Sequence, residues 1–131
     1  MPVKTLCTAS AVIEAGAGVA LMAVPSVLAK LLFGSPLDAP VAVMTGRLAG
    51  AALFTLAVGC WLARSDARSR AARGLVAAML FYNIAAVAVF LFAAFGPKLI
   101  GIALWPAVIL HAAMAGWSVV SLAKKNGAGM K

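Results

Sequence analysis

Acidic and polar side chains are scarce in this sequence. Only three of its 131 residues are Asp or Glu, one is His, and charged residues make up 11% of the chain, whereas hydrophobic residues make up 65%. Soluble globular domains are about 25% charged and about 45–50% apolar. The composition therefore excludes a soluble enzyme, a disordered tail and a disulfide-stapled secreted module. It predicts an integral membrane protein whose residues 1–131 form a single membrane domain.

The same scarcity excludes several kinds of site. A single His cannot supply bis-histidine haem ligation, and no second His is present to build a metal site. Catalytic triads, paired carboxylates and phosphate-binding glycine loops are absent, so no catalytic residue and no metal ligand is predicted, and a non-enzymatic protein is favoured. The formal net charge is +8. The basic residues are not interleaved with base-stacking aromatic residues, so nucleic acid is not an expected partner.

Four apolar segments are long enough to cross a lipid bilayer as helices, for which about 20 residues are needed. None of them alternates with the period of a barrel strand. We therefore predict an all-α, polytopic membrane protein, a four-transmembrane-helix up-down bundle. The predicted helical segments are residues 5–33, in which the part after Pro25 adds one or two turns near the interface, and residues 41–63, 74–95 and 99–122.

Proline, glycine and charge mark the connections between these segments. Residues 34–40 are rich in turn formers, and Gly96-Pro97 predicts a tight turn between the third and fourth spans. Residues 64–73 form a charged connector that is compatible with helix. Pro106 lies early in the fourth span, where a kink is tolerable and would splay the outer end of the bundle.

Basic residues fall mainly on one side of the predicted bundle. The positive-inside rule places that side, with both chain termini, in the cytoplasm, and so predicts a multi-pass protein of the bacterial inner membrane. The first span is too long for the apolar region of a signal peptide and carries Glu14, so a cleaved signal peptide is not expected. The predicted cytoplasmic residues are Lys4, Arg64, Arg68, Arg70, Arg73, Lys124, Lys125 and Lys131, and those on the other side are Lys30 and Lys98.

The two cysteines, Cys7 and Cys60, form neither a CxxC motif nor a metal-ligand spacing. In the predicted topology both lie near the cytoplasmic membrane edge, in a reducing environment, so a structural disulfide is not expected. Two interpretations stay open: a pair of redox-active thiols, and two small buried hydrophobic side chains, which is the commoner state of free cysteine.

Each predicted span carries one conspicuous polar residue at bilayer depth. Glu14 lies in the first span, Arg47 in the second and His111 in the fourth, while Asn83, beside Tyr82, lies in the third. An ionisable group at this depth costs at least about 2.5–3.5 kcal/mol, so such residues are functional candidates. The helical rise of about 1.5 Å per residue puts Glu14, Asn83 and His111 near one level. Arg47 lies closer to the outer boundary.

Small residues beside these positions predict that the polar side chains point into the bundle. Gly18 lies one turn after Glu14, and Gly46 and Gly50 form a GxxxG pair around Arg47 that allows helix backbones to approach closely. Spacing alone leaves open whether these two glycines pack within the bundle or between copies of a homo-oligomer.

Two interpretations of the polar cluster also stay open. In the structural one, Glu14 and Arg47 form a buried ion pair whose hydrogen bonds are completed by Asn83 and His111. In the functional one, the same residues, together with Tyr82, hold the polar head of an apolar small molecule such as a quinone or an isoprenoid lipid.

Several short motifs are distributed along most of the chain. They are the segments 14–18 (EAGAG), 31–34 (LLFG), 46–50 (GRLAG), 82–83 (YN), 105–106 (WP) and 110–112 (LHA), together with Pro25. In these motifs the chain resembles the DoxX-like family of small four-helix bacterial membrane proteins. The resemblance implies an up-down four-helix bundle and an accessory subunit linked to quinone or thiol redox chemistry. The expected partners are the lipid bilayer and either a membrane-protein complex or further copies of the chain in a homo-oligomer.

Three functions are compatible with these features. The first is an accessory or ligand-holding subunit in the lipid bilayer, and the second is a quinone-linked membrane oxidoreductase component that handles the quinone near His111 and Tyr82. The third is a small proton-coupled exporter that relies on Glu14, since four helices and a first-span glutamate resemble small multidrug transporters. The marked basic bias argues against the dual insertion of those transporters, and Arg47 would compete with a cationic substrate for Glu14.

Overall fold

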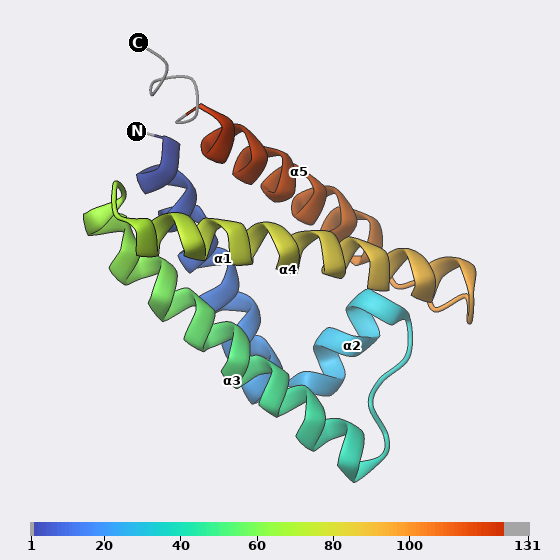
Figure 1. Ribbon diagram of the computed structural model, residues 1–131. Helices are drawn as coiled ribbons and strands as arrows, with labels where there is room; N and C mark the ends of the chain where they lie inside the picture. The colour runs from blue at the N-terminus through green and yellow to red at the C-terminus, as the bar shows by residue number, and fades with distance from the viewer. Residues whose placement is uncertain (1, 125–131) are drawn as a thin grey trace.

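The computed structural model describes residues 2–124, and within that range the chain is helical with no β-strand. Four helices are long and apolar enough to cross a membrane, which confirms the predicted all-helical class with four candidate spans. A fifth helix, α2, is too short to do so. The elements in chain order are α1 (Pro2–Ala23), α2 (Pro25–Phe33), α3 (Pro40–Ala63), the 3-10 turn η1 (Arg64–Asp66), α4 (Arg70–Phe95) and α5 (Leu104–Ala123) (Figure 1).

The four long helices form two antiparallel pairs, α1 with α3 and α4 with α5, and contacts between the pairs are much sparser than contacts within them. The pairs meet where α1 begins and where η1 leads from α3 into α4, and they diverge toward the opposite end (Figure 1). We call the first the basic end, because Lys4, Arg64 and Arg70 lie there, and the second the loop end. The predicted up-down order is present, but the pairs splay apart.

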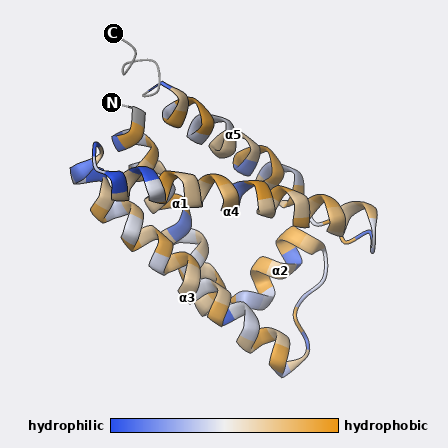
Figure 2. Cartoon of the chain, viewed as in Figure 1, coloured by the Kyte–Doolittle hydropathy of each residue, from blue (hydrophilic) through white to orange (hydrophobic). Residues whose placement is uncertain are grey.

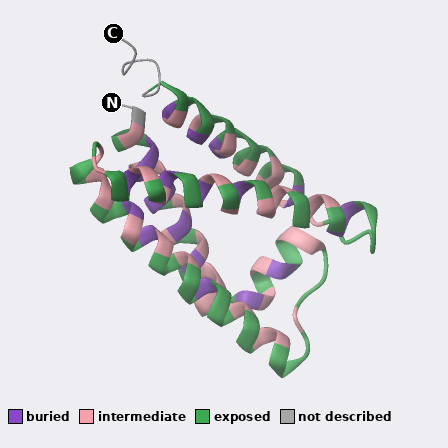
Figure 3. Ribbon diagram, in the orientation of Figure 1, coloured by how far each residue is buried: buried purple, intermediate pink, exposed green. Residues whose placement is uncertain are grey.

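Buried side chains concentrate toward the basic end, whereas the outward faces of the helices are exposed (Figure 3). Those faces are apolar, and hydrophilic residues gather mainly at the basic end (Figure 2). A water-soluble protein rarely exposes so large a continuous apolar surface, so these faces are suited to lipid. The two buried clusters are Leu6, Cys7, Val76 and Met114, and Ala11, Cys60 and Met79.

Helices α1 and α3 cross where two glycines face each other. A Cβ atom added at Gly18 would lie 2.8 Å from the carbonyl oxygen of Gly50, and one added at Gly50 would lie 2.7 Å from that of Gly18. Gly46 lies against Pro25 and Leu37 of the same chain. Both glycines of the GxxxG pair therefore pack within the chain, which answers the question that their spacing leaves open.

A single residue, Val24, separates α1 from α2. Its backbone leaves the helical region (φ −135°, ψ 58°), and Pro25 then occupies the first turn of α2, where a missing N–H is tolerated. Gly34 ends α2 in the left-handed conformation (φ 76°) that favours glycine. The predicted segment 5–33 is thus two helices, and α2 bridges the gap between the diverging pairs at the loop end (Figure 1).

The loop that precedes α5 completes the hydrogen bonding of α2. The N–H of Gly101 donates to the carbonyl of Leu32 (2.9 Å), and the N–H of Ala103 donates to that of Leu31 (2.8 Å). A side chain at Gly101 would overlap the carbonyl of Leu31, so the close approach requires glycine. These contacts satisfy carbonyls that the last turn of any helix leaves without a partner.

The prediction of a helix from residue 99 is therefore wrong by five residues, because Gly101 and Ala103 bond to α2 and the N–H of Leu99 bonds to the carbonyl of Ala93 in α4. The expected kink at Pro106 is also wrong. Pro106 is the third residue of α5, within the first turn, where an N–H has no intrahelical partner.

Helix α4 begins inside the charged connector, earlier than the predicted residue 74. The hydroxyl of Ser69 accepts a hydrogen bond from the N–H of Ala72 (3.0 Å), which is a side-chain N-cap. In the same connector the guanidinium of Arg64 lies 3.4 Å from the ring centroid of Trp61. Of the predicted cytoplasmic residues, Lys125 and Lys131 lie outside the described residues.

Candidate functional site

The centre of the site is a hydrogen bond between α4 and α5. Asn83 is 1% exposed, and its side-chain oxygen lies 2.7 Å from Nδ1 of His111. The amide nitrogen of Asn83 donates to the carbonyl of Met79 (2.7 Å), so this orientation presents only the oxygen to the ring. Nδ1 of His111 then carries the proton, which leaves Nε2 as an acceptor without a partner among residues 2–124.

Aromatic rings of α4 enclose His111. Tyr82 meets the imidazole edge to face (centroids 5.7 Å apart, 80°), and Phe90 lies at 5.6 Å with a tilt of 50°. Phe90 also contacts Phe33 of α2 (6.0 Å), so the rings continue toward the loop end. The sequence does not predict Phe90 as a site residue, because the aromatic residues of this span are typical of a lipid-facing and packing surface. Its position seven residues after Asn83, about two helical turns, is the signal that would have placed it on the same face.

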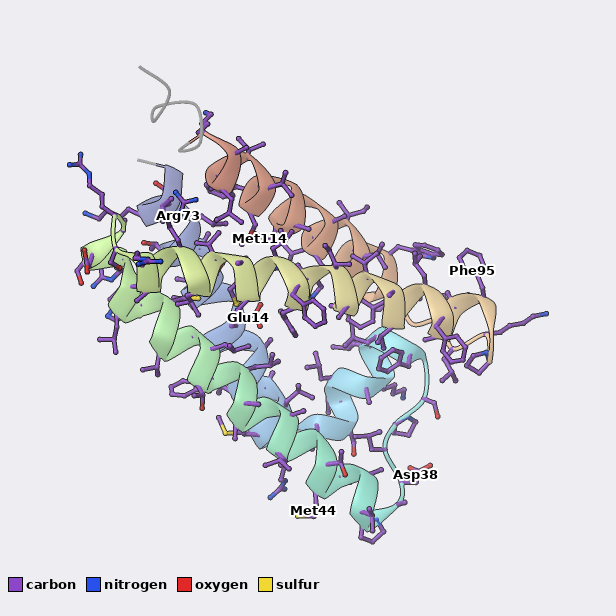
Figure 4. All side chains as sticks on the ribbon, in the orientation of Figure 1. Glu14, Asp38, Met44, Arg73, Phe95 and Met114 are labelled. Carbon is purple, nitrogen blue, oxygen red and sulfur yellow. The ribbon has the colours of Figure 1, made fainter. Side chains whose placement is uncertain are left out.

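Glu14 approaches the site from α1. Its side chain, labelled in Figure 4, is 2% exposed. The carboxylate lies close enough to Tyr82 and to Cys60 to act on both electrostatically. In the part of the chain that the structure describes, nothing donates a hydrogen bond to this carboxylate or forms an ion pair with it. A buried acidic group in this state lacks the partner that would offset its loss of hydration.

Arg47 does not belong to this group, and the predicted Glu14–Arg47 ion pair is not formed. Arg47 is exposed, and within residues 2–124 no carboxylate lies within 4 Å of it. Its neighbour Gly46 faces inward, and one residue further the helix has turned by about 100°, which carries Arg47 outward. The crossing of Gly18 and Gly50 also puts Glu14 level with Phe54, about 10 Å along α3 from Arg47.

The structure thus brings four of the five predicted cluster residues into one region and leaves the fifth outside. The four come from three helices: Glu14 from α1, Tyr82 and Asn83 from α4, and His111 from α5. They offer a hydroxyl donor, an imidazole acceptor and a carboxyl group next to aromatic rings. Over residues 2–124, no three His, Cys, Asp or Glu side chains are grouped closely enough to hold a metal ion.

Comparisons of the chain with protein-family models, with curated proteins and with solved structures gave no match. The function therefore has to be argued from the residues of the site and from the shape of the fold.

Proposed function

We propose that this protein is a multi-pass membrane protein that holds the polar head of an apolar small molecule and serves as an accessory or ligand-holding subunit. The observation that carries the proposal is that two polar groups of the site have no hydrogen-bond partner in the described chain. Asn83 fixes His111 with Nε2 free to accept, and the buried carboxyl of Glu14 has no partner in the described chain. Ligand pockets combine an apolar surround with a few convergent polar groups of this kind.

The site favours an amphipathic lipid with a small polar head, such as a quinone or an isoprenoid alcohol. A quinone carbonyl would accept from the Tyr82 hydroxyl, and a quinol or alcohol hydroxyl would donate to Nε2 of His111 or to Glu14. An apolar groove of about 260 Å³ between α1 and α3 offers a surface for the tail. Ala11 and Ala15 line that groove, each within one helical turn of Glu14.

The charge distribution supports the proposed location. The described basic residues of the α1 start, the α3–α4 connector and the α5 end lie at the basic end, whereas Lys30 and Lys98 lie at the loop end (Figure 2). We propose that the basic end faces the cytoplasm of a bacterium, so that both termini lie there. Membership of the DoxX-like family and a role beside a quinone-linked oxidoreductase agree with this proposal and stay predictions.

Native mass spectrometry of the protein, extracted gently from its own membrane, tests the ligand. We expect one small molecule per chain, identified by its released mass. His111→Ala should abolish retention because it removes the Nε2 acceptor and frees Asn83. Ile109→Ala, on the exposed face of the same helix, is the matched control and should retain the ligand. Equal retention by His111→Ala and the control would overturn the proposal.

A second candidate, proton-coupled export of cations, is favoured by one observation. Arg47 forms no ion pair with Glu14, so Arg47 does not compete with a cationic substrate for the Glu14 carboxylate. In this function a lipophilic cation such as tetraphenylphosphonium would displace a proton from Glu14. Detergent-solubilised protein should then release protons on addition of the cation. Glu14→Gln should abolish the release, and Asp38→Asn, at an exposed loop position, should leave it unchanged. No release by the unmodified protein would exclude this candidate.

A further inference from the structure

Sulfur-containing side chains from different helices meet near the basic end. Cys7 of α1 and Cys60 of α3 are free thiols, 2% and 1% exposed. They lie close enough to interact electrostatically, and they line one hollow together with Met79 of α4. This hollow is too narrow to admit a water molecule. It is separate from the hydrogen bond between Asn83 and His111.

The register of α1 against α3 explains why the two thiols meet. Cys7 precedes Gly18 by eleven residues, and Cys60 follows Gly50 by ten. Because the helices are antiparallel and cross at these two glycines, the cysteines lie at levels that differ by only about 1.5 Å. The glycine crossing holds the two backbones together at that register.

Methionines from the other helix pair complete the sulfur environment. Met79 of α4 belongs to the same buried cluster as Cys60. Met114 of α5, which is labelled in Figure 4, belongs to the same buried cluster as Cys7. Each of the four long helices therefore contributes one buried sulfur atom to the region where the two pairs meet.

We propose that Cys7, Cys60 and Met79 form a binding site for one soft monovalent metal ion of the Cu(I) type. Thiolate and thioether sulfur are the donors that select Cu(I) over harder cations. The narrow hollow favours an ion that sheds its water and bonds directly to sulfur.

Binding of the ion exchanges protons for metal–sulfur bonds. The S–H bonds of Cys7 and Cys60 break, two metal–thiolate bonds form and two protons leave the site. The thioether of Met79 donates a lone pair as a neutral third ligand. No atom changes its oxidation state, because the ion is supplied as Cu(I).

The test is a titration of the reduced, full-length protein in lipid nanodiscs under anaerobic conditions, with Cu(I) delivered in competition with bathocuproine disulfonate. We expect one Cu(I) per chain. Cys7→Ser and Cys60→Ser should each weaken binding by at least about 100-fold, and Met79→Leu by about 10-fold. Met44→Leu, which alters an exposed methionine of α3, is the matched control and should bind as the unmodified protein does.

Two further measurements separate loss of the site from loss of the fold. Thermal unfolding without metal shows whether each variant is folded, and Ag(I), a redox-inert probe of the same class, should raise the unfolding temperature of the unmodified protein but not of the folded serine variants. Cys60→Met keeps a soft sulfur and should retain part of the affinity. The proposal fails if the unmodified protein does not bind Cu(I) in a 1:1 ratio, or if the folded serine variants bind it equally well.

Discussion

The two helix pairs are held together by opposite means. Between α1 and α3 the helices cross at two residues that have no side chain, Gly18 and Gly50, so that one backbone lies directly against the other. Between α4 and α5 a side-chain hydrogen bond, from His111 to Asn83, connects the helices, and Tyr82 and Phe90 pack around it.

This difference suggests separate roles for the two helix pairs, one in packing and the other in ligand binding. Lipid provides no hydrophobic force between helices, so association depends on close backbone packing or on polar contacts. A glycine crossing fixes register but offers no group to a ligand. A polar contact offers such groups but tolerates more movement. The α1–α3 pair is suited to be the scaffold, and the α4–α5 pair carries most of the candidate ligand site.

The largest expected effect comes from filling the glycine crossing. Gly50→Ala would place a Cβ atom 2.7 Å from the carbonyl oxygen of Gly18 and 2.8 Å from the backbone nitrogen of Met22, neither of which can move alone. We expect the free energy of unfolding to fall by about 1–3 kcal/mol. Equilibrium unfolding in mixed micelles measures it.

Gly16→Ala is the matched control for this prediction, because a Cβ atom at Gly16 on the same pair of helices meets nothing within 4 Å. It should leave stability unchanged or raise it by up to about 1 kcal/mol. If the two alanine variants are equally stable, the crossing is not what holds α1 to α3.

A smaller effect is expected from the polar contact of the other pair. In a double-mutant cycle of Asn83→Ala and His111→Ala, the coupling free energy should be about 0.6–1.7 kcal/mol, the range of hydrogen bonds between membrane helices. The same unfolding assay measures it. Pairing His111→Ala with Ile84→Ala, an exposed neighbour of Asn83, should give no coupling. Additive losses in the first cycle would mean that the contact does not join α4 to α5.

The smallest effect is expected between Glu14 and Arg47. Since Arg47 is exposed and does not reach Glu14, Arg47→Ala and Glu14→Gln should be additive, with a coupling free energy below about 0.5 kcal/mol. A coupling free energy of several kcal/mol would show that the ion pair forms in the bilayer and that Arg47 belongs to the site.

The sequence predicts the membrane-spanning helices well because long apolar runs and proline or glycine breaks are local signals. The helical rise also puts Asn83 and His111 at one level, and the structure joins them by a hydrogen bond. Depth, however, does not give direction around the helix axis. The side chain of Arg47 points outward because Gly46 and Gly50 lie on the face of α3 that packs against the rest of the chain.

Other differences arise from contacts between distant segments. Residues 99–103 are apolar enough to continue the fourth span, and only their pairing with the end of α2 shows why they do not. Cys7 and Cys60 are predicted at similar depth, but their lateral proximity depends on where α1 crosses α3. No local pattern in the sequence specifies that crossing point.

The hydrogen bonds at the end of α2 also impose an order on biosynthesis. The carbonyls of Leu31 and Leu32 receive their donors from Gly101 and Ala103, which leave the ribosome about 70 residues later, some 4–14 s at about 5–20 residues per second. During that interval α3 and α4 are synthesised while the last carbonyls of α2 lack these partners. Helix α2 is therefore synthesised early in translation, but its last carbonyls receive their hydrogen bonds only after the loop that precedes α5 has been synthesised.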